Sequence, residues 1–168
     1  MFSSRLFGQH AFENEIRSYE KQDSISMPAK GQILFIGSSS FRIWKTFATD
    51  LAGISAINRG FGGSTLTDAL YYFDRMVLTY APSTVVVYEG DNDLAKGKSP
   101  EELAKEYEDF SNRLKKSLPK TKLVYLAVRP SLARIAIVDK QKQFNSRLAD
   151  YCKSQKGRFY SSYCRDSG

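Results

Sequence analysis

Short apolar runs, separated by longer segments with helical periodicity, set the pattern of this chain. A continuous apolar run is typical of a strand buried on both faces of a parallel sheet. Strands are predicted at Ile33–Ile36, Ile54–Asn58, Thr84–Tyr88 and Leu123–Val128, and a fifth begins at Arg158–Tyr160. Thr84–Tyr88 has the strongest strand propensity, because Thr, Val and Tyr all favour an extended backbone.

Helical periodicity fills the segments between these runs. Phe12, Ile16 and Tyr19 share one face of a helix over residues 12–22, and a polar linker containing Pro28 leads from it to the first strand. Phe41, Trp44 and Phe47 recur at helical spacing after the first strand. A further helix is predicted over Thr67–Thr79, with Thr67 as N-cap, and another over Val138–Gln155. The helix predicted over Ser99–Leu118 has a clear start, because Ser99 and Glu102 can form a capping box and Pro100 suits the first helical position.

Strands that alternate with helices of about ten residues or more predict βαβ units. The expected fold is therefore a single α/β domain with a parallel sheet and helices on both faces. Ligands of such sheets bind beyond the carboxyl ends of the strands. Three loops leave those ends, at Ser38–Ser40, Gly60–Ser64 and Gly90–Asp93, so we expect them to meet at one edge.

Composition sets limits on the class of protein. Hydrophobic residues make up 42% of the chain and charged residues 26%, which is ordinary for a globular protein. No apolar stretch approaches the roughly 18 residues that span a bilayer, and residues 1–10 lack the apolar core of a signal peptide. Cys152 and Cys164 lack the spacing of a zinc or redox site, so we expect reduced thiols in a cytoplasmic protein.

The net charge of +7 is unevenly distributed. Residues 1–95 carry 8 Lys and Arg against 10 Asp and Glu, whereas residues 96–168 carry 17 against 8. The basic residues are spread over predicted helices with few interleaved aromatic residues, rather than gathered in one motif. Solvated helix faces therefore explain the charge better than a nucleic-acid or anionic-lipid surface does.

The end of the first strand suggests nucleophilic catalysis by a serine. Ile33–Ile36 stops on Gly37, and three serines follow. A serine at the start of a helix lies where backbone N–H groups and the helix dipole favour negative charge. Ser38–Ser40 also fit a simple N-cap, and this segment alone favours the cap, because serine is a preferred capping residue. This segment by itself leaves both interpretations open.

Two other strand ends offer hydrogen-bond donors for an oxyanion. Gly60–Ser64 is rich in glycine, so its backbone N–H groups can approach a substrate closely. The same loop fits an ordinary turn or a phosphate-binding loop. Asn92 can donate a side-chain N–H to the same point, although a lone asparagine is most often a turn residue. Ester cleavage by serine needs a nucleophile, such donors and a base.

Together the three segments resemble the SGNH hydrolases, also called the GDSL esterase/lipase family. Gly37-Ser38-Ser39 matches the Gly-Asp-Ser block with serine in place of aspartate, as in a bacterial subgroup that reads Gly-Ser-Ser-Ser-x-Arg-x-Trp. Asn58–Thr65 matches the second block and Gly90–Asp93 the third. Val128–Ser131 is similar to a Lys/Arg-Pro-Ser segment of the same subgroup, and the resemblance covers residues 12 to 159.

The resemblance implies a site and an activity. Ser39 corresponds to the nucleophile, and its N–H forms the oxyanion hole with Gly63 and Asn92. The implied fold is a flavodoxin-like three-layer α/β/α sandwich with a five-stranded parallel sheet. The implied reaction is hydrolysis of small acyl or acetyl esters of lipids or carbohydrates, without metal or cofactor and without a nucleic-acid partner. Residues 1–30 are then an N-terminal helix and linker, and residues 31–168 the hydrolase-type domain.

The family's final block, Asp-x-x-His, has no match in the chain. The only histidine is His10, and the loop before Asp166 is too short for Asp166 to begin that block. We therefore interpret the chain as stopping before the block and before the family's last helix. The expected esterase is feeble, because loss of a triad member leaves only about 10³–10⁴-fold catalysis over water. The missing helix should also expose an apolar patch that promotes self-association.

No other residue is a strong candidate for the base. Nothing in the sequence aims His10 at Ser39, and Asp91 and Asp93 are expected to be exposed carboxylates of ordinary pKa, which are weak bases.

Two alternatives to an esterase stay open. One is a catalytically inactive binding module that keeps the pocket, and the other is a flavodoxin-like phosphate or nucleotide binder that uses Gly60–Ser64. The chain lacks the Gly-x-x-x-x-Gly-Lys-Ser/Thr motif that is typical of such nucleotide binders.

Overall fold

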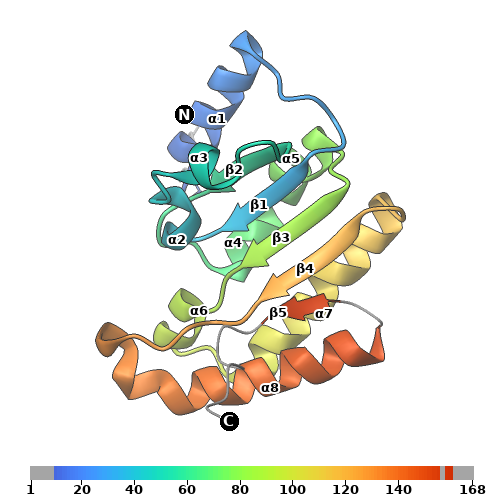
Figure 1. Ribbon diagram of the computed structural model, residues 1–168. Coiled ribbons are helices and arrows are strands. Elements are labelled where there is room, and N and C mark those ends of the chain that lie inside the picture. The colour runs from blue at the N-terminus through green and yellow to red at the C-terminus, as the bar shows by residue number, and fades with distance from the viewer. Residues whose placement is uncertain (1–9, 156–157, 161–168) are drawn as a thin grey trace, which may run out of the picture.

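A parallel five-stranded sheet lies at the centre of the computed structural model, which describes residues 10–155 and 158–160 (Figure 1). The spatial order of the strands is β2-β1-β3-β4-β5, and every pairing is parallel. The strands are β1 (Ile33–Gly37), β2 (Ala56–Gly60), β3 (Thr84–Tyr88), β4 (Lys122–Leu126) and β5 (Arg158–Tyr160). The predicted α/β fold with a parallel sheet is confirmed, and β3 has the predicted bounds.

Helices flank the sheet. The α-helices are α1 (Glu13–Ile25), α2 (Ser39–Arg42), α3 (Phe47–Asp50), α4 (Leu66–Tyr71), α5 (Phe73–Met76), α6 (Asp91–Ala95), α7 (Pro100–Ser117) and α8 (Val138–Ser154), and the 3₁₀ helices are η1 (Leu78–Tyr80) and η2 (Leu132–Ile137). The helix predicted to start at Ser99 is confirmed, since Ser99 and Glu102 form the reciprocal bonds of a capping box in front of α7. Among the described residues, no helix is both long and apolar enough to cross a membrane.

One face of the sheet carries the main core. Leu34, Ile36, Val85 and Val87 are buried in it, because alternate residues of a strand point to the same face. Figure 1 shows α4 and α7 passing behind the strands on this side. The helices contribute apolar side chains that include Ile16, Leu66, Phe73, Leu103, Phe110 and Phe144. Ile16, predicted on the apolar face of the first helix, is therefore a core residue.

The opposite face holds a smaller cluster. Phe41, Val86 and Tyr88 are buried there, with Phe35 and Trp44 packed against them. Within the described part of the chain, the helices that contact this face are the short α2 and α3. The sheet is thus flanked on both sides, but unequally. The predictions about Asp166, Cys164 and the chain end fall outside the described residues.

The aromatic repeat after the serines does not form one helix. α2 and α3 are separate turns, because Trp44 Nε1 and the Thr46 hydroxyl both donate to Asp50 Oδ2, at 2.6 and 2.7 Å, and stabilise a turn between them. The Phe41 and Phe47 rings still pack against one residue, Phe35, with centroids 5.4 and 5.2 Å from its ring. Aromatic packing on β1 therefore produced the helix-like spacing.

The helix predicted over Thr67–Thr79 begins earlier and is interrupted. Thr65 is the N-cap, and Asp68 completes its capping box, so the prediction of Thr67 as the cap is wrong. The segment then divides at Tyr72 into α4, α5 and η1. Tyr72 is buried and its hydroxyl donates to the Ala11 carbonyl at 2.8 Å, so tertiary packing determines the path of the chain here.

Arg59 of β2 attaches α1 to the sheet. Its guanidinium carbon lies 4.9 Å from the ring centroids of both Tyr19 and Tyr80, and it forms an ion pair with Asp23. Both charged side chains are only 9% exposed. The Tyr19 hydroxyl also donates to the Gly60 carbonyl. The N-terminal helix is therefore held by a buried charged pair between two aromatic rings.

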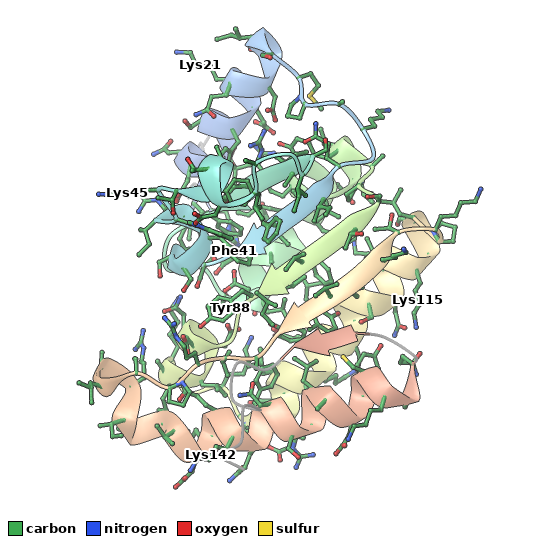
Figure 2. All side chains as sticks on the ribbon, in the orientation of Figure 1. Lys21, Phe41, Lys45, Tyr88, Lys115 and Lys142 are labelled. Atoms are coloured by element: carbon green, nitrogen blue, oxygen red, sulfur yellow. The ribbon has the colours of Figure 1, made fainter. Side chains whose placement is uncertain are left out.

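The basic residues of the second half lie on the surface. Lys115 of α7 and Lys142 of α8 point away from the body of the protein (Figure 2). Several of them pair with acidic neighbours, as Arg147 does with Glu101. Cys152 is a buried free thiol, and burial raises its pKa to about 11, so it is poorly suited to redox or metal chemistry.

Candidate active site

The carboxyl ends of β1, β2 and β3 meet at one edge of the sheet. The register pairs Gly37 with both Gly60 and Tyr88, so the loops that follow these three residues start side by side. A Cβ atom on Gly37 would lie 2.2 Å from the Tyr88 carbonyl oxygen, and only glycine permits this contact. The three loops therefore meet because of the strand order, and Gly37 allows β1 and β3 to approach closely where the loops begin.

The three serines after β1 occupy different environments. Ser38 is buried at the N-cap of α2, but its side chain makes no capping hydrogen bond. The Ser40 hydroxyl bonds to Tyr88, whose ring lies beside Phe41 in Figure 2. Ser39 is exposed at the first position of α2, and no described side chain bonds to its hydroxyl. Of the three, Ser39 is the one free to meet a substrate.

Hydrogen bonds fix the loop after β2 just before Gly63. Asn58 accepts from Gly60 N and donates to the Phe41 carbonyl at 2.7 Å, which joins β2 to α2. Gly62 N donates to the Glu15 carboxylate at 3.3 Å. Gly63 has a φ of +85°, and the space where its side chain would be is empty. A substrate could therefore approach the backbone of Gly63 closely.

Asn92 is held in one orientation by two partners. It lies in the first turn of α6, a helix that the sequence pattern did not predict. Its Nδ2 donates to the Ser64 carbonyl at 2.9 Å, and its Oδ1 accepts from Arg134 of η2 at 3.0 Å. One of the two Nδ2 hydrogens stays available. The structure therefore directs the Asn92 amide toward the loop that contains Gly63.

The two aspartates beside Asn92 differ from the sequence prediction. Asp93 is buried, not exposed: it accepts from Leu66 N at 3.1 Å and pairs with Lys98 at 3.0 Å. Burial raises the pKa of its carboxyl despite the lysine. Asp91 accepts from Gln141 Nε2 at 2.6 Å and from the Tyr88 hydroxyl at 3.3 Å. Both carboxylates are occupied by structural bonds, which explains why neither is a free base.

His10 is also occupied elsewhere. Its ring stacks on Tyr71 with centroids 3.7 Å apart and planes at 5°, and its Nδ1 lies 3.0 Å from the Ala11 carbonyl. The contacts of the only histidine are therefore with the N-terminal segment and α4 rather than with Ser39. Among the described residues, no group of three His, Cys, Asp or Glu side chains could hold a metal ion.

Three residues of this region were not singled out from the sequence. Glu15 and Arg134 reach the site from distant segments, and no local pattern could reveal them. Glu89 did leave a signal: it continues the alternation of Val85 and Val87 and so points into the core. It lies 2.5 Å from the Ser64 hydroxyl, and burial raises its pKa well above the ordinary value of 4.5.

The protein is an α/β protein with three candidate site residues at the carboxyl edge of its parallel sheet: Ser39, Gly63 and Asn92. A serine beside backbone and amide donors is the arrangement that acyl transfer needs. The family model of the GDSL-like Lipase/Acylhydrolase family matches residues 28–167. The chain therefore belongs to this family, whose members are carboxylic ester hydrolases. No curated protein matches the chain.

Solved structures share the fold. A GDSL-like lipase from Bacteroides thetaiotaomicron has a TM-score of 0.75 and 23% identity, with 88% of this chain and 78% of that one covered. A catalytic mutant of Axe2, an acetylxylan esterase from Geobacillus stearothermophilus, has a TM-score of 0.63 and 12% identity, with 78% and 76% covered. At these identities the similarity concerns the fold.

Proposed function

We propose that this protein is a serine ester hydrolase that acts on small acyl or acetyl esters through Ser39. The Ser39 N–H, the Gly63 N–H and the Asn92 amide form the oxyanion hole in this proposal. The observation that carries it is the orientation of Asn92, whose amide is held between Ser64 and Arg134 beside the open Gly63. Donors placed in advance where negative charge develops are the main requirement for acyl transfer.

The proposal includes a low rate for this 168-residue chain. The only histidine stacks on Tyr71, so Ser39 lacks a base of the usual kind among the described residues. An oxyanion hole and binding alone leave about 10³–10⁴-fold catalysis over water.

Membership in the Gly-Ser-Ser-Ser-x-Arg-x-Trp subgroup is also part of the proposal. Arg42 of that motif pairs with Glu15 at 2.7 Å and lies against Gly62, which joins the first two blocks.

A fluorophosphonate probe and p-nitrophenyl acetate together test the proposal. The probe should label the folded protein at Ser39 and leave the Ser39→Ala variant unlabelled. Ser38→Ala and Ser40→Ala are matched controls that should still be labelled, because they change neighbouring hydroxyls only. Absence of labelling, together with acetate release no faster than that of Ser39→Ala, would refute catalysis by this chain.

The competing function is a binding module that keeps the pocket without catalysis. The engagement of His10 with Tyr71, away from Ser39, favours it. Saturable binding of an ester or an acetylated oligosaccharide that survives Ser39→Ala, without turnover, would select this function. A phosphate or nucleotide binder is weaker, because Gly62 N is already bonded to the Glu15 carboxylate and is not available to an anion. Calorimetric titration with nucleotides should therefore show no heat of binding.

A further inference from the structure

Glu89 lies beneath the loop that carries the proposed oxyanion donors. It is the residue after β3, and its side chain is 1% exposed. Its Oε1 lies 2.5 Å from the Ser64 hydroxyl oxygen. Its Oε2 is buried and has no partner among the described residues. A carboxylate in such a place is costly unless both oxygens are bonded.

The hydrogen atoms around Ser64 show which form of Glu89 fits. The Ser64 hydroxyl oxygen is 2.9 Å from the Phe61 carbonyl and 2.5 Å from Glu89, and both would be acceptors if Glu89 were ionised. A hydroxyl donates one hydrogen, so it can bond to only one of them, and the Phe61 carbonyl would then keep only a long bond from Ser64 N at 3.5 Å. An un-ionised Glu89 removes the conflict: its O–H donates to Ser64, and Ser64 donates to Phe61.

The charged groups around Glu89 favour the same form. The carboxylates of Asp93 and Asp68 oppose a further negative charge, whereas Lys96 and a hydrogen bond donated by Ser64 act in the other direction. Tyr107 of α7 packs against the same residue: its hydroxyl accepts from Glu89 N at 3.2 Å and donates to the Glu89 carbonyl at 2.9 Å. Burial contributes most to the raised pKa of the Glu89 carboxyl.

The hydrogen bonds continue from Ser64 to the site. Asn92 Nδ2 donates to the carbonyl of the same Ser64 that Glu89 holds through its side chain. We propose that Glu89 acts as an un-ionised carboxylic acid that positions the Ser64–Asn92 pair, and through it the oxyanion hole. An ionised Glu89 would instead take the Ser64 hydroxyl hydrogen from the Phe61 carbonyl and place a negative charge beneath the donors. This positioning role rests on the proposed function of Asn92.

Nuclear magnetic resonance of the Asn92 side-chain amide tests the proposal without any need for turnover. The signal is assigned with Asn92→Asp, and Glu89→Gln is compared with Glu89→Leu. The amide introduced by Glu89→Gln stays neutral and can still donate to Ser64, so this variant should keep the wild-type Asn92 signal at neutral pH. Glu89→Leu removes the donor and should shift the signal. Ser64→Ala, which deletes the link, should shift it in the same way and serves if Glu89→Leu does not fold.

A pH titration separates positioning from simple packing. In the wild type, the Asn92 signal should move, and labelling of Ser39 should fall about 10- to 100-fold, as the pH rises through the raised pKa of Glu89. Glu89→Gln should abolish both changes. Glu106→Gln, a control on α7 that removes an acid bonded to Thr67 and Lys98, should leave both in place.

Each outcome has a defined meaning. An Asn92 signal that is the same in the wild type and Glu89→Leu, or a pH transition of equal size in Glu89→Gln, would overturn the role of Glu89. If no variant is labelled but the Asn92 signal responds as expected, the proposed hydrolase function is wrong while the Glu89–Ser64–Asn92 arrangement stands. If the wild type unfolds before Glu89 ionises, the comparison of Glu89→Gln with Glu89→Leu at neutral pH decides.

Discussion

The buried pair of Arg59 and Asp23 gives the sharpest prediction about the fold. Replacing Arg59 with methionine leaves the Asp23 carboxylate in a site that is only 9% exposed, without its counter-ion. Removal of one partner from a buried ion pair costs about 3–5 kcal/mol. Loss of the cation–π contacts with Tyr19 and Tyr80, at 4.9 Å each, adds about 1–2 kcal/mol.

The expected loss is therefore about 4–7 kcal/mol, which is a large part of the roughly 5–15 kcal/mol that stabilises a typical domain. At about 2–4 °C per kcal/mol for a chain of this size, the melting temperature should fall by about 8–28 °C. Urea unfolding followed by circular dichroism measures the change, with thermal unfolding as a second measurement.

The matched control is the double variant Arg59→Met with Asp23→Leu. Replacing both charges with apolar side chains is often neutral, so the double variant should recover most of the lost stability. A loss below about 1 kcal/mol in the single variant would contradict the reasoning, because exposed ion pairs have that magnitude. A double variant no more stable than the single one would show that packing of the arginine, rather than charge pairing, holds α1.

Three further changes have defined outcomes. Gly37→Ala should cost about 1–3 kcal/mol more in urea unfolding than Gly97→Ala, because both glycines have a positive φ but only the Cβ at Gly37 would also collide with a backbone oxygen, at 2.2 Å; equal costs would contradict this. Arg134→Met should slow Ser39 labelling about tenfold with little change in melting temperature, because it removes the bond to Asn92 Oδ1; unchanged labelling would show that Asn92 needs no such support. Glu89 has a raised pKa in the folded state, so the stability it contributes is present below its ordinary value of 4.5 and is lost as pH rises through the folded pKa. Glu89→Gln should therefore lose less stability than the wild type as pH rises above 4.5, and parallel curves of unfolding free energy against pH would count against this.

The elements that depend on local signals were predictable from the sequence. β3 has the predicted bounds because Thr84–Tyr88 is a continuous run of strand-forming residues. α7 starts where Ser99 and Glu102 predict it, because a capping box involves only neighbouring residues. The meeting of the three loops followed from the parallel order of the strands, and the candidate residues Ser39, Gly63 and Asn92 lie in or directly after those loops.

The errors had two causes. The cap of α4 was a local signal that the prediction missed, because Thr65 and Asp68 form a capping box three residues apart. The burial of Asp93 depends on contacts beyond its own loop. Asp93 was expected to be exposed, but Leu66 N and Lys98 reach it from other segments. Such partners lie outside the loop that carries Asp93, so no local pattern could have indicated its burial.

The sequence by itself determined the class of fold, the family and the positions of the candidate site residues, because strand and helix periodicity and glycine-containing loops are local properties. Only the tertiary structure decided how the site is supported. It shows Asn92 held by Ser64 and Arg134, Glu89 buried beneath Ser64, and His10 stacked on Tyr71. Hydrogen-bond partners and burial depend on atoms that folding brings together from distant segments, and this is the physical reason that only the folded chain could show them.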